Sequence, residues 1–176
     1  MGSLPVTSNA SNKASTTVRA ATPTDMPTLG HLGTLLMALH HDLDPKRFIP
    51  ATPRTEQAYA SFLEGELLRS EVVLLAAVKG GAVLGYAYAG VEGSDYMALR
   101  GPAGVLYDLI VDPTRRGEGI GRMLLGATLS ELASRGVPRI VLSTAARNEA
   151  AQGFFAKVGF RPTMIEMARE INRSPG

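Results

Sequence analysis

The sequence predicts a mixed α/β fold, built on a mostly antiparallel twisted sheet with helices packed against it. The middle of the chain holds two apolar runs, residues 72–78 and 82–91, which Lys79-Gly80-Gly81 joins with a hairpin signal. Over residues 105–158, apolar runs alternate with amphipathic stretches in the order strand, helix, strand, helix. Antiparallel pairing followed by strand–helix alternation is typical of a mixed sheet covered by helices.

Four segments are expected before the hairpin. A strand covers 18–21, and Thr24 or Asp25 caps a helix that ends near Leu39. A polar break at 40–45 then separates this helix from an amphipathic helix at 55–68.

After the hairpin, a glycine-containing loop is expected at 92–104, and further elements follow it. They are a strand at 105–111, a helix at 120–135, a strand at 139–144, a helix at 148–158, and one or two strands at 164–171. Gly159 fits a helix stop.

Length and composition predict one domain over residues 17–173, preceded by a disordered tail at 1–16 that is rich in Ser, Asn and Thr. The tail lacks the apolar core of a signal peptide, and no apolar stretch approaches 18 residues, so no membrane partner is expected. The absence of cysteine excludes disulfides and thiolate chemistry and fits a cytoplasmic location. A net charge of +2, without a basic run and with 6% aromatic residues, argues against nucleic acid as a partner.

The most informative stretch is the glycine-rich turn between the strand at 105–111 and the helix that follows it. Gly117, Gly119 and Gly121 remove side chains from this turn, so backbone N–H groups can approach a ligand closely. The helix start adds free N–H donors and a positive dipole end, which together favour a phosphate. Nearby arginines add charged contacts to phosphate oxygens; they are Arg115, Arg116 and Arg122.

Two common phosphate-binding motifs are excluded by spacing. A P-loop needs a lysine after its last glycine, and none is present. A dinucleotide fingerprint needs Gly-x-Gly-x-x-Gly, whereas these glycines alternate. A plain glycine-rich connection without a ligand remains the structural alternative at this point.

The stretch from Leu109 to Gly121 resembles the acetyl-CoA signature of the GNAT superfamily of N-acetyltransferases. The signature Arg/Gln-x-x-Gly-x-Gly/Ala is matched by Arg116, Gly119 and Gly121. A second family element follows as Asn148-x-x-Ala151-x-x-Phe154-Phe155-x-Lys157-x-Gly159-Phe160, and the resemblance spans about residues 17–171.

The resemblance implies that acetyl-CoA enters a gap between splayed fourth and fifth strands, and that a primary amine of a small molecule or peptide receives the acetyl group. It also implies a homodimer, which is frequent in the family. The cofactor-binding residues it implies are Leu109, Ile110, Val111, Arg115, Arg116, Gly117, Glu118, Gly119, Ile120, Gly121, Arg122, Asn148, Ala151 and Phe155. Asn148 at a helix start also fits a cap, and Phe155 also fits a core position.

For catalysis, the resemblance implies that a backbone N–H within 109–111 polarises the thioester carbonyl. The family's usual proton donor, a tyrosine, is replaced here by Phe155. This departure supports an alternative function, a non-catalytic acyl-CoA-binding regulatory domain. Tyr107 and Asp108 stand where relatives carry a base, although strand alternation puts them on opposite faces unless a bulge intervenes. Packing for Tyr107 and a structural hydrogen bond for Asp108 are the alternatives.

His40 and His41 are candidate substrate-binding residues, because they fall where the family's acceptor site is commonly covered and because histidine titrates near neutrality. Adjacent histidines cannot both face one metal ion from a helix, and no ligand cluster accompanies them, so no metal is expected. The alternative is a pair of solvent-facing loop residues or a helix end.

Overall fold

The computed structural model describes residues 15–171, and its centre is one five-stranded sheet with the strand order β1-β2-β3-β4-β5. The strands are β1 (Thr17–Ala20), β2 (Val72–Lys79), β3 (Ala82–Glu92), β4 (Ala103–Val111) and β5 (Ile140–Leu142). The first three junctions are antiparallel, and β5 joins β4 in parallel. The predicted fold class is therefore confirmed.

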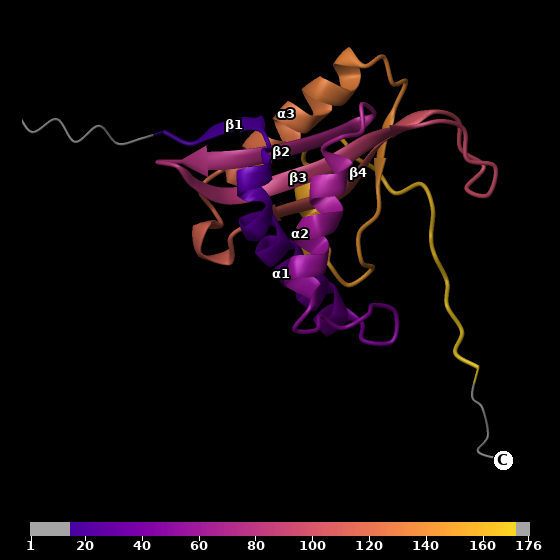
Figure 1. Cartoon of the computed structure of the whole chain (residues 1–176). Helices are drawn as coiled ribbons and strands as arrows, with labels where there is room; N and C mark the ends of the chain where they lie inside the picture. The colour runs from indigo at the N-terminus through magenta and orange to yellow at the C-terminus, as the bar shows by residue number, and fades with distance from the viewer. Residues whose placement is uncertain (1–14, 172–176) are drawn as a thin grey trace, which may run out of the picture.

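Helices cover both faces of this sheet (Figure 1). They are α1 (Met26–Leu43), α2 (Thr55–Glu66), α3 (Ile120–Ser134) and α4 (Glu149–Ala156), with short 3-10 turns at Pro23–Asp25 and Pro113–Arg115. On one face, α1 and α2 bury Leu29 and Leu63 against Tyr86. On the other face, α3 buries Leu124 and Leu132 against the strands, and α4 adds partly buried aromatic rings. None of the helices described is long and apolar enough to cross a bilayer.

The hairpin between β2 and β3 forms where the sequence predicts it. Lys79 pairs with Ala82, so the connection is the two residues Gly80 and Gly81. Both have positive φ angles, 57° and 85°, as the twist of a two-residue hairpin requires.

Helices α1 and α2 approach each other closely because α1 carries two glycines on the face toward α2. A Cβ on Gly30 would come 2.4 Å from the carbonyl oxygen of Glu56, and one on Gly33 would come 2.2 Å from the ring of Tyr59. Alanine at either position would force the helices apart. The bare backbone of Gly33 therefore leaves room for the Tyr59 ring between α2 and the sheet.

A bulge interrupts the pairing of β3 with β4. Tyr88 pairs with Asp108, whereas the next residue, Ala89, pairs with Leu106, so Tyr107 is an extra residue on β4. Strict alternation would put Asp108 on the same face as Leu106. Because of the bulge, Leu106 joins the core under α3 and Asp108 contacts the tyrosines on the α1–α2 face instead.

The strands β4 and β5 separate after a short paired stretch. Pairing begins at Gly104 with Ile140 and ends at Leu106 with Leu142, although β4 continues to Val111. Within residues 15–171, the remaining half of β4 therefore has no strand beside it on that edge, which confirms the expected splay.

Two expectations from the sequence are wrong. The polar break predicted at 40–45 is in part helical, because α1 continues to Leu43 and includes both His40 and His41. The strands predicted near 164–171 do not form, and this segment is extended without a ladder. Its apolar pattern favours a strand only where a neighbouring strand pairs with it, and Ile165 and Met167 are 83% and 90% exposed. Most of the tail expected at 1–16, and the end of the domain expected at 172–173, lie outside the described residues.

Candidate active site

The glycine-rich turn is built by backbone conformation. Gly117 and Gly119 have φ angles of 84° and 80°, in the left-handed region that favours glycine. A Cβ at either position would meet nothing within 4 Å, so the requirement is conformational and not one of space. Ile120, 2% exposed, anchors the start of α3 in the core. The local chain is thus rigidly directed from β4 into α3.

Free N–H groups gather at this turn. The first backbone bond of α3 runs from the N–H of Met123 to the carbonyl of Gly119 at 3.1 Å. The N–H groups of residues 120–122 precede that bond and have no partner in the helix ladder, so they form an anion-binding end. Before the turn, Asp112 ends β4 by accepting a hydrogen bond from the N–H of Thr114 at 2.8 Å.

The charged side chains of the turn differ in whether they have an ion-pair partner. Arg115 donates to Glu118 at 2.7 and 2.9 Å, and Glu118 does not line the neighbouring cavity. Arg116 and Arg122 line that cavity and have no ion-pair partner in the described part of the chain. Arg116 and Arg122 therefore face the cavity without an ion-pair partner among the described residues, whereas Glu118 is the partner of Arg115.

One cavity of about 1280 Å³ connects the turn with the splay and with the second half of α1. Every cofactor-binding residue expected from the sequence, except Glu118, lines it. Tyr107, Asp108 and His40 also line it, whereas His41 does not. Lys157, which belongs to the second family element, lines the same cavity. So do residues that the sequence did not single out, namely Tyr59, Phe48, Ile49, Ser143 and Thr144.

Asn148 caps α4. Its side-chain oxygen accepts a hydrogen bond from the N–H of Ala151 at 3.1 Å, as the cap interpretation predicted, and both residues line the cavity. Phe155 packs edge-on against Phe154 and Phe160, with ring centroids 5.3 and 5.7 Å apart. Phe155 thus combines a packing contact with a place on the cavity wall.

The C-terminal half of β4 directs backbone N–H donors toward the gap between β4 and β5. The N–H of Asp112 bonds to the carbonyl of Leu84 on β3 at 2.8 Å. Because N–H directions alternate along an antiparallel strand, the N–H groups of Val111 and Leu109 point away from β3. They face the edge where β5 no longer pairs, which is the wall of the cavity.

Asp108 is a half-buried carboxylate that lines the cavity. Its Oδ2 accepts hydrogen bonds from the hydroxyl of Tyr59 on α2 and, at 2.9 Å, from the hydroxyl of Tyr86 on β3. Burial raises the pKa of Asp108 above its ordinary value, while the two hydroxyl donors act in the opposite direction. Burial also raises the pKa of Tyr59 and Tyr86, so both hydroxyls stay protonated and donate.

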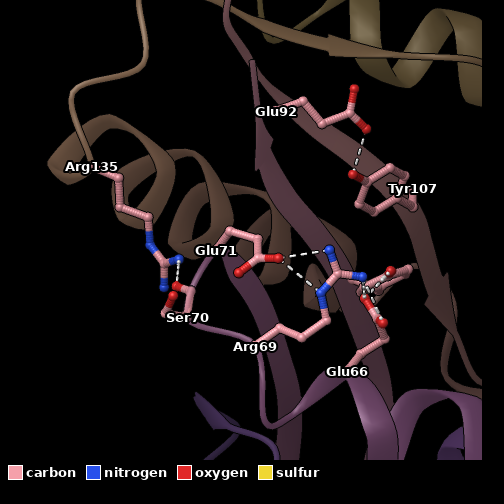
Figure 2. Close-up of polar contacts among 8 residues, drawn as sticks. Glu66, Arg69, Ser70, Glu71, Glu92, Tyr107 and Arg135 are labelled. Carbon is pink, nitrogen blue, oxygen red and sulfur yellow. Dashed lines mark hydrogen bonds and ion pairs between the residues drawn. The ribbon is translucent and has the colours of Figure 1, made fainter.

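Tyr107 is tied to a polar cluster at the other end of β3 and β4 (Figure 2). Its hydroxyl donates to Glu92 at 2.6 Å, and its ring lies 4.7 Å from the ring of Tyr88. In the same cluster, Arg69 lies between Glu66 and Glu71 and bonds to both. Glu92 and these three residues do not line the cavity. The Tyr107 hydroxyl is therefore engaged in holding the sheet end.

His40 and His41 make similar hydrogen bonds but lie on different sides of the cavity wall. Nδ1 of His40 lies 2.8 Å from the carbonyl oxygen of Leu36, and Nδ1 of His41 lies 2.7 Å from that of Phe48. A carbonyl only accepts, so Nδ1 carries the proton in both rings. His40 lines the cavity, and His41 fixes the loop after α1 from outside it. Among residues 15–171, no group of three or more His, Cys, Asp or Glu is placed to bind a metal ion.

The match that decides the family is to the model of the acetyltransferase (GNAT) family, which covers residues 36–160. The chain belongs to the GNAT family. This membership agrees with the enzyme class and the co-substrate expected from the sequence, an acetyltransferase that uses acetyl-CoA.

Named relatives match this GNAT chain over part of their length. Mycothiol acetyltransferase of Nocardia farcinica is 38% identical over 71 residues, 40% of this chain and 23% of that protein. That of Thermobispora bispora is 36% identical over 95 residues, 52% of this chain and 30% of that protein. The match therefore spans less than a third of either relative.

Solved structures share the fold over nearly the whole chain. A mutant of the BH1408 protein from Bacillus halodurans has a TM-score of 0.79 at 23% identity, covering 89% of this chain and 99% of that one. The aminoglycoside N-acetyltransferase AAC(6')-Iy, solved with CoA, has a TM-score of 0.68 at 18% identity, covering 92% and 97%. At such identities, the likeness shows the fold.

Proposed function

We propose that this protein is an N-acetyltransferase that moves the acetyl group of acetyl-CoA to a primary amine of a small molecule or peptide. The observation that carries the proposal is that one cavity contains both the anion-binding turn and the half-buried carboxylate of Asp108, which two tyrosine hydroxyls hold in place. The first suits the phosphates of the donor, and the second suits the amine of the acceptor.

The donor half of the cavity fits the parts of acetyl-CoA in order. The N–H groups at the start of α3, with Arg116 and Arg122, suit the pyrophosphate. The N–H groups of Leu109 and Val111 suit the amide and thioester carbonyls of the pantetheine arm, because they have no strand partner on that edge. The α4 residues Asn148, Ala151 and Phe155 form the opposite wall.

An acceptor that binds as an ammonium ion first releases one proton to solvent. In the transfer step, the neutral amine nitrogen then forms a bond to the thioester carbon and the carbon–sulfur bond breaks. A backbone N–H of Leu109 or Val111 stabilises the negative charge on the carbonyl oxygen. Asp108 accepts the proton that the amine loses, and burial suits it to this role because a raised pKa brings a base closer to neutral pH. The thiolate leaves without a proton from Phe155, as a thiol of pKa about 8.5 permits.

The alternative function, a non-catalytic acyl-CoA-binding domain, rests on Phe155. Asp108 favours the enzyme, because burying a carboxylate is unfavourable and the structure supplies two tyrosine donors to hold it at the cavity. A domain that binds acyl-CoA alone has no use for such a group. A homodimer, a cytoplasmic location and a single domain over 17–173 remain predictions from the sequence.

The test is an absorbance assay for free thiol, run with acetyl-CoA and a panel of primary amines, next to calorimetric binding of acetyl-CoA. We expect micromolar to millimolar binding of acetyl-CoA and amine-dependent thiol release. Normal binding without turnover on any amine would contradict the enzyme and support the binding domain. Loss of binding in Arg116→Ala is expected under both functions, and unchanged binding would contradict the placement of the phosphates.

A further inference from the structure

Along the second half of α1 and the loop that follows it, the cavity lining is mostly apolar, with His40 and Tyr59 as its polar members. The second half of α1 contributes Leu36, Met37 and Leu39, and the loop after α1 contributes Phe48 and Ile49. We call this part of the cavity the acceptor chamber. It adjoins the site that the proposed function assigns to the amine, so the chemistry of its walls bears on what the amine is attached to.

The loop wall of the acceptor chamber is held in place from several sides. The carbonyl of Phe48 accepts from His41 at 2.7 Å, and the Phe48 ring lies edge-on to His40 with centroids 5.0 Å apart. The Arg47 guanidinium lies over the Phe48 ring, 5.1 Å from its centroid, and pairs with Glu166 of the C-terminal segment. An apolar surface that is fixed before binding recognises ligands by shape and apolar contact.

Negative charge is scarce on the cavity walls. Among the described residues that line the cavity, the carboxylates are Asp108 and Glu149, and Glu149 belongs to the first turn of α4 on the donor side. The acidic residues near the chamber in sequence, Asp42, Asp44 and Glu56, do not line it. The chamber thus offers one carboxylate, which balances one ammonium group.

We propose that the acceptor is a primary monoamine whose amine is attached to an uncharged apolar body, aliphatic or aromatic. This inference rests on the proposed function. The amine lies at Asp108, and the body packs against Phe48, Ile49 and the second half of α1. A polycationic acceptor does not fit, because its further ammonium groups would lie against apolar walls without partners.

The test compares acceptors that differ by one charge at equal length. Butylamine and 1,4-diaminobutane form the matched pair, with phenethylamine as an aromatic monoamine and kanamycin as a polycation. With acetyl-CoA saturating, we expect kcat/KM for both monoamines to exceed that for the diamine and kanamycin by at least about tenfold, as discrimination by apolar pockets reaches 10–200-fold.

Two variants locate the effect in the chamber. Phe48→Ala should raise KM for phenethylamine by about tenfold with kcat and acetyl-CoA affinity little changed. Ile49→Asp, at a side chain 70% exposed and therefore tolerant of charge, should shift the ratio of kcat/KM toward the diamine. Leu68→Ala is the control, because Leu68 is 90% exposed and lies outside the cavity.

The outcomes separate this inference from the function on which it rests. Turnover that favours the diamine or kanamycin would overturn the monoamine acceptor and leave the acetyltransferase in place. Equal ratios in wild type and Ile49→Asp would overturn the placement of the amine's body in the chamber. Binding of acetyl-CoA without turnover on any of the four amines would overturn both.

Discussion

The donor and acceptor halves of the cavity are built by different means. The phosphate end of the donor half uses backbone N–H groups from one continuous stretch, residues 117–122, which left-handed Gly117 and Gly119 orient. The acceptor half uses side chains that four separate elements bring together, among them Asp108 and Tyr59, which are 49 residues apart in the chain. A site made of backbone follows from local sequence, whereas a site made of side chains follows from the tertiary fold.

The difference predicts that the two halves fail in different ways. A change in the donor half alters the binding of acetyl-CoA, because the backbone donors contact the cofactor in both ground and transition states. A change at Asp108 or at the tyrosines that hold it alters the chemical step, because proton transfer occurs only on the way to the transition state. The substitutions that follow test this separation.

The largest effect is expected from Asp108→Asn. Asn keeps the shape and can still accept from the Tyr59 and Tyr86 hydroxyls, but it cannot take a proton from the amine. We expect kcat to fall by about 10²–10⁴-fold, the usual contribution of a general base, with an unchanged dissociation constant for acetyl-CoA. Steady-state kinetics and calorimetry on the same preparation measure both. A fall of less than threefold would favour the structural role for Asp108.

Gly119→Val should show the reverse pattern. A β-branched residue at a φ of 80° is strained by about 1–2 kcal/mol. The turn therefore changes conformation, and its N–H groups no longer point toward one ligand position. We expect the dissociation constant for acetyl-CoA to rise about tenfold or more, with kcat at saturation reduced less. Gly126→Ala is the control, because a Cβ there meets nothing within 4 Å in a helix. Equal affinity in both variants would contradict the turn as the phosphate site.

Tyr59→Phe tests, through the pH dependence of kcat, whether the Tyr59 hydroxyl controls the protonation of Asp108. The Tyr59 hydroxyl favours the charged form of Asp108, so its removal should raise the pKa of that carboxyl further. Because the base works when deprotonated, activity is lost as pH falls through this pKa. The acid limb of kcat should therefore move to higher pH in Tyr59→Phe. A uniform loss of kcat at every pH would instead indicate packing alone.

The same contrast explains what the sequence could predict. The signature at Arg116, Gly119 and Gly121 sets its own local geometry, so the glycine-rich turn, the splay and the α4 cap follow from local pattern and family resemblance. Tyr59 sits in an ordinary amphipathic helix, and its contact with Asp108 depends on a bulge in β4 and on the bare backbone of Gly33. Local sequence pattern predicts neither the bulge nor the close approach of Tyr59 to α1. The prediction of a strand at 164–171 was wrong for the same reason, because apolar alternation does not show whether a partner strand exists.

The smallest effect is expected at the boundary of the two halves, in Phe155→Tyr. The side chain lines the cavity from α4 and stands where the family usually has its proton donor. A hydroxyl on this ring would protonate the leaving thiolate, but a group of pKa about 8.5 leaves with little help. We therefore expect kcat to rise by less than about tenfold, far below the usual 10²–10⁴-fold effect of proton transfer.

Melting temperature is the control for Phe155→Tyr, because the ring packs against Phe154 and Phe160 and the added oxygen must not disturb them. With an unchanged melting temperature, a rise of a hundredfold or more would show that the natural chain lacks a needed acid. That result would revive the binding domain as the function of the natural sequence. An unchanged or slightly raised kcat supports unassisted departure of the thiolate. Proton transfer from the amine to Asp108 is then the step in which a side chain assists the reaction.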